Sequence, residues 1–166
     1  SDIGVANDFR RIGLVRDPTN FGTTTVATAT TRRQIYATVF SSVSGTFTAD
    51  EEINQATTGA VAKVIEFDST NKILYYYQTR FPDVGTDTNG NLTAISGANA
   101  ITGQSSSASA TPNTSSSATV NGVTFASGYA NPELAYDSGD IIYVEERSPI
   151  TRASDQTENI KLIIEF

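Results

Sequence analysis

The sequence contains no cysteine, histidine, tryptophan or methionine. Because there is no cysteine, the chain has neither a disulfide framework nor a thiolate that could act as a nucleophile. Because histidine is also missing, the Ser–His–Asp arrangement, its Cys–His variant and zinc sites built from His or Cys are excluded. The chain therefore lacks the residues for the commonest forms of covalent catalysis and zinc binding.

Basic residues are also scarce. The 11 Lys and Arg residues are outnumbered by 18 Asp and Glu residues, which gives a net charge of −7. The basic residues are scattered, with close pairs at Arg10–Arg11 and Arg32–Arg33. Nucleic acids and anionic membranes bind clusters of Lys and Arg, so we expect neither as a partner. A membrane-spanning helix needs about 20 consecutive apolar residues, and no apolar run in the sequence approaches that length.

Long segments with a helical period are absent, and short strand-like runs take their place. Such runs occur at Arg11–Val15, Thr23–Ala29, Gln34–Phe40, Ala60–Phe67, Lys72–Gln78 and Asp140–Glu145. The polar connection Asp68–Asn71 separates two of these runs, which is typical of a β-hairpin. Both faces of this hairpin carry apolar residues, so we expect both to be covered. We predict an all-β fold of small barrel-like or sandwich-like antiparallel sheets, with long surface loops and little helix.

One short helical turn is predicted just before the hairpin. Residues Thr48-Ala49-Asp50-Glu51 have the spacing of a capping box, in which the hydroxyl and the carboxylate each bond a backbone amide. The residues Gln55–Gly59 offer no helical continuation. We therefore expect a single turn there.

The stretch Thr102–Thr119, TGQSSSASATPNTSSSAT, consists mostly of Ser and Thr and has no aliphatic residue larger than Ala. Such a stretch buries too little apolar surface to offset the entropy of ordering its backbone, so it predicts a flexible surface loop. Its neighbours Ala94–Ile101 and Val120–Phe125 are expected to be strands that the loop joins.

These patterns predict one all-β unit over residues 1–166. Within it we expect a compact β subdomain at 46–101, the flexible Ser/Thr-rich loop at 102–119, and returning strands at 120–166 that complete the main sheet. The first residue is Ser1 and not Met, from which we expect a fragment of a longer protein.

The end of the chain, DQTENIKLIIEF, has a period-two pattern. Ile160, Leu162, Ile164 and Phe166 fall on one side of a period-two pattern, and Lys161 and Glu165 fall on the other. This is the pattern of a half-buried strand. We expect it to complete a sheet, with Ile163 packing against a second layer or another subunit.

Carboxylates are the remaining candidates for chemistry. The doublets Glu51–Glu52 and Glu145–Glu146 have the residue types of a glycosidase pair. Adjacent residues on a strand point to opposite faces, so neither doublet forms a pair alone. We interpret both as solvated charges at the ends of strands or turns, and predict no enzymatic activity and no catalytic residue.

Two further stretches have the composition of binding sites. Asp83–Asn91 is rich in oxygen ligands but lacks the acidic spacing of a calcium loop, and Asn89-Gly90 is better explained as a turn. Tyr75-Tyr76-Tyr77 has the residue type of a sugar-stacking platform, but only two of three consecutive strand residues share a face. We therefore predict no metal, no cofactor and no cofactor-binding residue, and favour a core or interface role for the tyrosines.

The last residues also carry a family resemblance. GDIIYVEERSPITRASDQTENIKLIIEF resembles the C-terminal end of the dimeric baseplate wedge subunit of T-even-type contractile-tailed phages and related cyanophages. ADEEINQATTGAVAKVIEFDSTNKILYYYQTRF is similar to a β module that recurs in phage tail proteins. The family protein is longer than this chain, so the resemblance implies a C-terminal portion.

The resemblance implies a structural virion protein without enzymatic activity, located in the tail baseplate and in the host cytoplasm during assembly. Its implied partners are a second copy of itself and other baseplate wedge proteins. The family supplies no active-site residues to carry over. The alternative is a carbohydrate-binding β module of a tail fibre or an adhesin.

Overall fold

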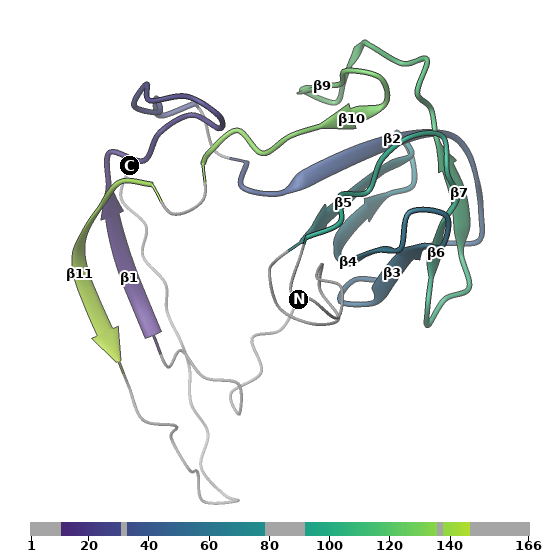
Figure 1. Ribbon diagram of the computed structural model, residues 1–166, viewed down its shortest axis with the longest axis horizontal. Coiled ribbons are helices and arrows are strands. Elements are labelled where there is room, and N and C mark those ends of the chain that lie inside the picture. The colour runs from purple at the N-terminus through teal and green to yellow at the C-terminus, as the bar shows by residue number, and fades with distance from the viewer. Residues whose placement is uncertain (1–10, 31–32, 79–91, 136–137, 147–166) are drawn as a thin grey trace, which may run out of the picture. The chain divides into compact units, whose positions relative to one another are not determined.

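The computed structural model describes residues 11–30, 33–78, 92–135 and 138–146. These residues form eleven strands and no helix, and all the strand pairs are antiparallel (Figure 1). This confirms the predicted all-β fold. Among the described residues there is no helix with the length and hydrophobicity to cross a membrane. Where one unit was expected, the chain divides into two compact units, residues 19–137 and residues 1–18 with 138–166.

The larger unit is built on a seven-stranded sheet in the order β10-β2-β5-β4-β3-β6-β7. Its strands are β2 (Tyr36–Ser44), β3 (Glu52–Gln55), β4 (Ala60–Asp68), β5 (Ile73–Tyr77), β6 (Ile101–Gly103), β7 (Ser109–Pro112) and β10 (Tyr129–Ala130). The first half of β2 pairs with β5 and its second half pairs with β7. Six strands, all but β10, therefore close into a small barrel.

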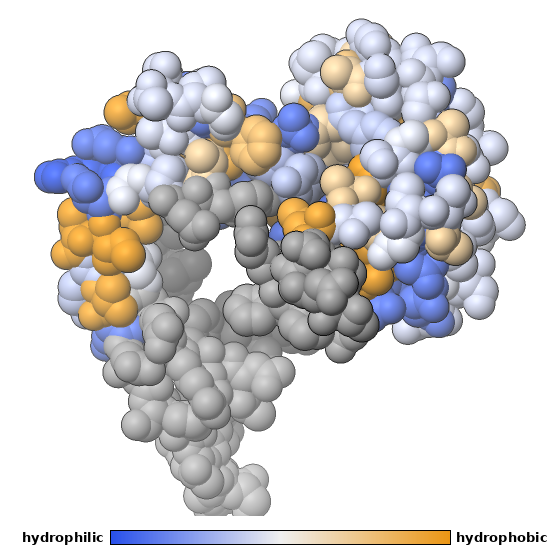
Figure 2. Space-filling view, viewed as in Figure 1, coloured by the Kyte–Doolittle hydropathy of each residue, from blue (hydrophilic) through white to orange (hydrophobic). Residues whose placement is uncertain are grey.

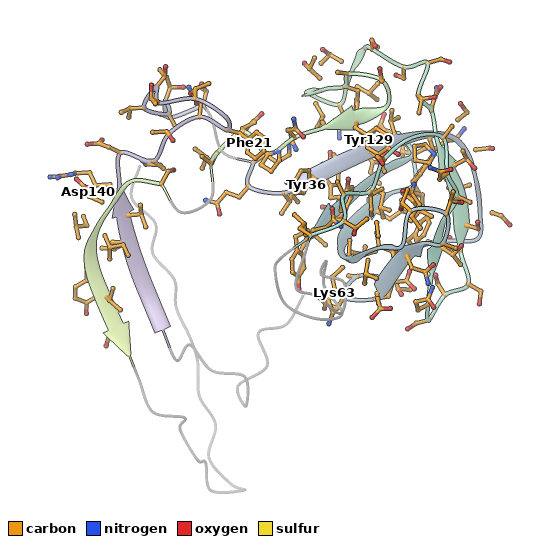
Figure 3. The ribbon with its side chains drawn as sticks, in the orientation of Figure 1. Phe21, Tyr36, Lys63, Tyr129 and Asp140 are labelled. Atoms are coloured by element: carbon orange, nitrogen blue, oxygen red, sulfur yellow. The ribbon has the colours of Figure 1, made fainter. Side chains whose placement is uncertain are left out.

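The interior of the barrel is filled by one hydrophobic cluster. Its buried members are Phe40, Phe47, Ile53, Ala60, Ala62, Val64, Leu74, Tyr76, Ile95, Ile101, Ala108 and Ala110. Phe47 stacks on Phe40 with the ring centroids 6.0 Å apart. Tyr36 stacks on Tyr76 with the ring centroids 5.6 Å apart. On its other contact Tyr36 meets the edge of Phe21 at 6.4 Å, and Figure 3 shows these two side chains next to each other. Aromatic pairs in these geometries add to the stability from buried area.

A β-bulge at Ile65 sets which residues of β4 face the interior. Val64 pairs with Tyr76 and Glu66 with Tyr75, so Ile65 is an extra residue on β4. Before the bulge Val64 is buried in the cluster, and after it Phe67 packs there although the two are an odd number of residues apart. The bulge leaves Ile65 itself 41% exposed, and it explains why the alternation in this strand is irregular.

A second cluster covers the outer side of β2 and β5. Its buried members are Ala37, Val39, Ile73, Val123, Phe125 and Ala130. In β5, Ile73 belongs to this outer cluster and the adjacent Leu74 to the interior one, and both are fully buried. The prediction that the hairpin is covered on both faces is therefore confirmed for β5, whereas Ile65 and Glu66 of β4 are exposed.

The outer cluster depends on a tight hairpin between β8 (Thr119–Val120) and β9 (Val123–Thr124). Its turn residues Asn121 and Gly122 have φ values of 48° and 77°. Asn-Gly in this conformation is the preferred two-residue hairpin turn. The predicted single strand Val120–Phe125 is therefore wrong, because the chain reverses at Asn121-Gly122.

Two other predicted strands are also wrong. In place of the strand Thr23–Ala29 there are turns, held by bonds such as Asn20 N to Thr25 O at 2.8 Å, and a single bridge between Thr19 and Val26. The second is Ala94–Ile101, in which Ile101 is the one residue that lies in a strand. Two buried glutamines hold this stretch instead. Gln55 Nε2 donates to Asn99 O at 2.9 Å, and Gln55 Oε1 accepts from Ser96 N at 2.9 Å. Gln78 Nε2 donates to the O of Thr93, just before the stretch, at 2.8 Å.

The Ser/Thr-rich segment 102–119 contributes to the barrel. It includes most of β6 and all of β7, and Ala108, Ala110 and Pro112 are buried. The expectation that nothing in it could join a core is wrong, since an Ala side chain fills a narrow interior when its strand is paired on both sides. The flexibility of the segment stays a prediction.

The predicted subdivision also changes. The strands of 46–101 share one sheet with β2 and β7, so they do not form a separate subdomain. Among the returning strands β10 joins the main sheet, whereas β11 (Asp140–Glu146) pairs with β1 (Arg11–Arg16) in the smaller unit. The terminal strand Ile160–Phe166 lies outside the described residues.

Candidate functional site

The Glu51 carboxylate is buried within a ring of donors. Its Oε1 accepts from Thr48 N at 2.7 Å and from Ser106 Oγ at 2.8 Å. Its Oε2 accepts from Ser105 N at 3.1 Å and Ser106 N at 2.9 Å. The residue is 5% exposed, so the interpretation of Glu51 as a solvated charge is wrong. No sequence signal indicated it, because its most distant partners follow it by more than fifty residues.

The same contacts correct the predicted helical turn. The bond from Thr48 N to the Glu51 carboxylate is one half of a capping box. The backbone there is a turn without helix, with Asp50 at a φ of 65°, and it leads directly into β3. The capping-box spacing therefore predicted a contact correctly and the element wrongly.

Burial raises the pKa of the Glu51 carboxyl, but the hydrogen bonds from Ser106, Thr48 and Ser105 outweigh it, and the pKa lies below its ordinary value. All four partners are donors, so they stabilise the ionised form. A carboxylate whose oxygens are both occupied in this way has a structural role. Glu52 faces Lys63 on β4 and forms no pair with Glu51.

The other predicted candidates do not gather into a site. Tyr143 Oη donates to Glu145 Oε2 at 3.2 Å. The described residues contain no cluster of three or more acidic residues that could hold a metal ion, and Asp83–Asn91 lies outside them. Tyr76 is buried, whereas Tyr75 and Tyr77 are half-buried, so a core role accounts for at least the central tyrosine.

The most distinctive surface is on the smaller unit, where β1 and β11 form a two-stranded antiparallel ribbon. Its six exposed apolar side chains, which we call the apolar ribbon surface, are Leu14, Val15, Ile141, Ile142, Tyr143 and Val144, and each is between 48 and 70% exposed. Figure 2 shows an apolar area on the visible face of the two strands, between hydrophilic residues. Monomeric soluble proteins rarely expose such contiguous apolar surface.

Both faces of the ribbon contribute to this surface. Leu14 lies opposite Tyr143, and Val15 lies opposite Ile141. Opposed residues share a face, and neighbours along a strand point to opposite faces. Because the register shifts between Leu14 and Val15, Ile142 is an extra residue on β11. Each face of the ribbon therefore has an apolar centre, and the two strands alone bury neither face.

Charged residues close one end of the ribbon. Arg16 Nη2 bonds Asp140 Oδ2 at 2.9 Å, and Arg16 Nε lies 3.7 Å from Asp17 Oδ2. Gly139 has a φ of 87°, and a Cβ there would lie 2.6 Å from Arg16 O. Both strands of the ribbon confirm predictions, namely Arg11–Val15 for β1 and Asp140–Glu145 for β11. Nothing in the sequence indicated that these two strands pair.

Comparison with known protein families gives a match over part of the chain. Residues 79–166 match a family model described as Phage-Gp8: Bacteriophage T4, Gp8. The matched region includes β11 and so one strand of the ribbon. No curated protein matches the chain, and no solved structure does.

Proposed function

This chain belongs to the Phage-Gp8 family of bacteriophage T4 Gp8, a baseplate wedge subunit, and from this membership we propose that it is a structural subunit of a contractile-tail baseplate wedge. Its place is then the tail baseplate of the virion, reached after assembly in the host cytoplasm. We propose that it acts through protein–protein contacts and carries out no catalysis. Its partners are other wedge proteins and, in a homodimer, a second copy of itself.

The observation in the structure that supports this role is the apolar ribbon surface. A two-stranded ribbon is at best marginally stable in water unless something covers an apolar face. The barrel differs, because its interior and the outer side of β2 and β5 each have a buried cluster of their own. We therefore assign the contacts with wedge partners to the ribbon.

The proposal predicts that Val144→Asp weakens incorporation of the chain into phage particles. A carboxylate buried in an interface without a partner costs several kcal/mol, so we expect incorporation to fall by about tenfold or more. The measurement is quantitative mass spectrometry of purified particles from phage that carry the variant gene. Ile65→Asp is the matched control, since Ile65 is also apolar and exposed on a strand but lies on the barrel.

Both variants should keep the circular dichroism and melting temperature of the wild-type chain, because both positions are exposed in the isolated chain. Particles that contain Val144→Asp chains at the wild-type level would show that the ribbon is not a contact surface. A phage whose purified tails lack the chain altogether would contradict the proposed function itself.

A further inference from the structure

The tip of the β8–β9 hairpin carries an Asn-Gly pair whose side chains have few constraints. Asn121 and Gly122 are both exposed, and a Cβ at Gly122 would meet nothing within 4 Å. The strands β8 and β9 have two residues each and form a sheet of two strands. So short a hairpin opens at a lower free-energy cost than the barrel does. The turn can therefore leave its left-handed conformation while the barrel stays folded.

An opened Asn-Gly turn has a reaction available to it in water. The backbone nitrogen of Gly122 can reach the side-chain carbonyl carbon of Asn121, because Gly has no side chain to block the approach. The nitrogen bonds to that carbon and loses its proton, and the carbon releases its NH2 group as ammonia, which leaves a succinimide ring. Water then adds to one ring carbonyl and opens the ring. The product is aspartate or isoaspartate, and in isoaspartate the backbone runs through the side chain.

The amide group that this reaction removes has a defined contact. Asn121 Nδ2 donates to Asp68 Oδ2 at 3.2 Å. Hydrogen bonds, chiefly from Asn71 and also from Thr70 and Asn121, lower the pKa of Asp68, so its carboxyl group is ionised at neutral pH. Deamidation puts a carboxylate in place of the Asn121 donor. Two carboxylates this close repel each other, so the contact changes from attractive to repulsive.

The hairpin matters because it supplies part of the outer cluster. Val123 and Phe125 are buried members of that cluster, and Val120 packs against it. The bond to Asp68 ties the tip of this hairpin to the turn between β4 and β5. Isoaspartate also lengthens the backbone of a turn that has two residues, so the pairing of Val120 with Val123 no longer fits. Both products therefore weaken the cover on β2 and β5.

We propose that Asn121 is a modification site, at which spontaneous deamidation loosens the β8–β9 hairpin from the outer side of β2 and β5. The reaction needs water and no enzyme. The inference goes beyond the proposed baseplate role and does not depend on it, because it follows from the contacts of this hairpin.

Peptide mapping of the aged chain tests the site. The whole chain is incubated in a mildly alkaline buffer, and mass spectrometry follows the mass increase from NH2 to OH at each asparagine. Labelling with an isoaspartyl methyltransferase detects the isoaspartate product. Asn71 is the internal control, since it also donates its side chain to Asp68 but is followed by Lys72. We expect Asn121 to convert at several times the rate of Asn71.

Two variants test the structural consequence. Asn121→Gly cannot deamidate, and the Gly-Gly pair that it creates suits the same turn. The aged wild-type chain should melt at a lower temperature than the fresh chain, whereas ageing should change the melting temperature of Asn121→Gly less. The chain's other Asn-Gly pair, Asn89-Gly90, is present in both proteins, so its conversion does not affect this comparison.

Asn121→Asp isolates the effect of charge, because it and Asn121→Gly both lose the bond to Asp68. We expect Asn121→Asp to melt about 2–4 °C below Asn121→Gly at low salt. Added salt should reduce that difference, since it screens the repulsion between exposed carboxylates.

Two results would overturn the inference. Conversion of Asn121 no faster than that of Asn71 would show that the turn is not a modification site. A chain that is converted at position 121 and melts like the fresh chain would show that the modification does not loosen the hairpin. Neither result affects the particle measurement with Val144→Asp, so failure of this inference and failure of the proposed function are distinguishable.

Discussion

Replacing Glu51 with Gln is expected to lower the free energy of unfolding by about 2–4 kcal/mol. Four donors converge on the two carboxylate oxygens, from Thr48, Ser105 and Ser106. A Gln side chain has one oxygen, and its amide nitrogen would face N–H or O–H groups that need an acceptor. This decrease is a large share of the total free energy of unfolding of an ordinary domain, which is about 5–15 kcal/mol.

The surroundings leave little room for adjustment. A Cβ at Gly103 would lie 2.5 Å from Ser106 Oγ and 2.6 Å from Glu51 Oε2. Gly103 itself pairs with Ile53 of β3, where the barrel joins β3 to β6. Glu51 therefore holds the β6–β7 connection against the start of β3. A donor that loses its acceptor there cannot form a hydrogen bond with water unless the strands separate.

Urea unfolding followed by circular dichroism measures this prediction, with Glu66→Gln as the matched control. Glu66 lies on β4 and is exposed, so its neutralisation should change the midpoint little. Equal midpoints for the two variants would mean that the Glu51 contacts do not stabilise the barrel.

The same residue predicts a dependence on pH. The pKa of Glu51 in the folded chain is lowered from the ordinary value of 4.5, so its contribution to stability is complete above that value. It is lost as the pH falls through the lower pKa of the folded state. Below that pKa the wild-type chain and Glu51→Gln should therefore differ less in unfolding midpoint than they do at neutral pH.

Gly128→Ala is the second substitution with a large expected effect. Gly128 has a φ of 80°, and a Cβ there would lie 2.5 Å from the backbone oxygen of Asn113. The left-handed conformation costs an L residue about 1–2 kcal/mol, and overpacking typically adds about 1–3 kcal/mol. We expect a total loss of about 3 kcal/mol or more in the free energy of unfolding.

Backbone bonds on both sides of Gly128 prevent a shift that would relieve the contact. Its N donates to Ser116 O at 2.7 Å, and its O accepts from Val39 N at 3.0 Å and from Thr38 Oγ1 at 2.9 Å. Gly122→Ala isolates the effect of space, because Gly122 has a φ of 77° and a Cβ there would meet nothing within 4 Å. If the two alanine variants unfold at the same urea concentration, the close approach to Asn113 is not a constraint.

Local patterns in the sequence predicted local structure. The hairpin of β4 and β5 has two strand-forming runs and a polar turn, in which Asp68 Oδ1 accepts from Thr70 N and Asn71 N. All of these residues lie within one short stretch, so the sequence pattern and the contacts coincide. The bulge at Ile65 was not predicted, because it is defined by the register between β4 and β5.

Contacts between distant parts of the chain could not be predicted in the same way. Arg16 and Asp140 are separated by 124 residues, and the closure of the barrel joins β2 to β7 across four intervening strands. The Ser/Thr-rich segment has weak strand propensity, and the pairing of β6 and β7 with β3 and β2 overrides it. The burial of Glu51 could not be predicted either. Most of the groups that donate to its carboxylate are backbone amides, and a backbone amide leaves no pattern in the sequence.

The candidate site was predicted in part. The apolar run Ile141–Val144 predicted a strand, and it is one. A run of this kind is equally compatible with a strand buried on both faces, so its exposure could not be inferred before its single partner β1 was known. The resemblance to baseplate wedge proteins came from the same stretch, and it agrees with the family match over residues 79–166.

The central claim is that the ribbon contacts another protein of the baseplate, and photo-crosslinking in assembled particles tests it most directly. A benzophenone amino acid is placed at position 144 in one phage and at position 65 of the barrel in another, and the crosslinked products are identified by mass spectrometry. We expect position 144 to crosslink to a second protein chain of the baseplate and position 65 to do so far less. Crosslinks from position 144 that remain within the same chain, or that do not exceed those from position 65, would contradict the claim.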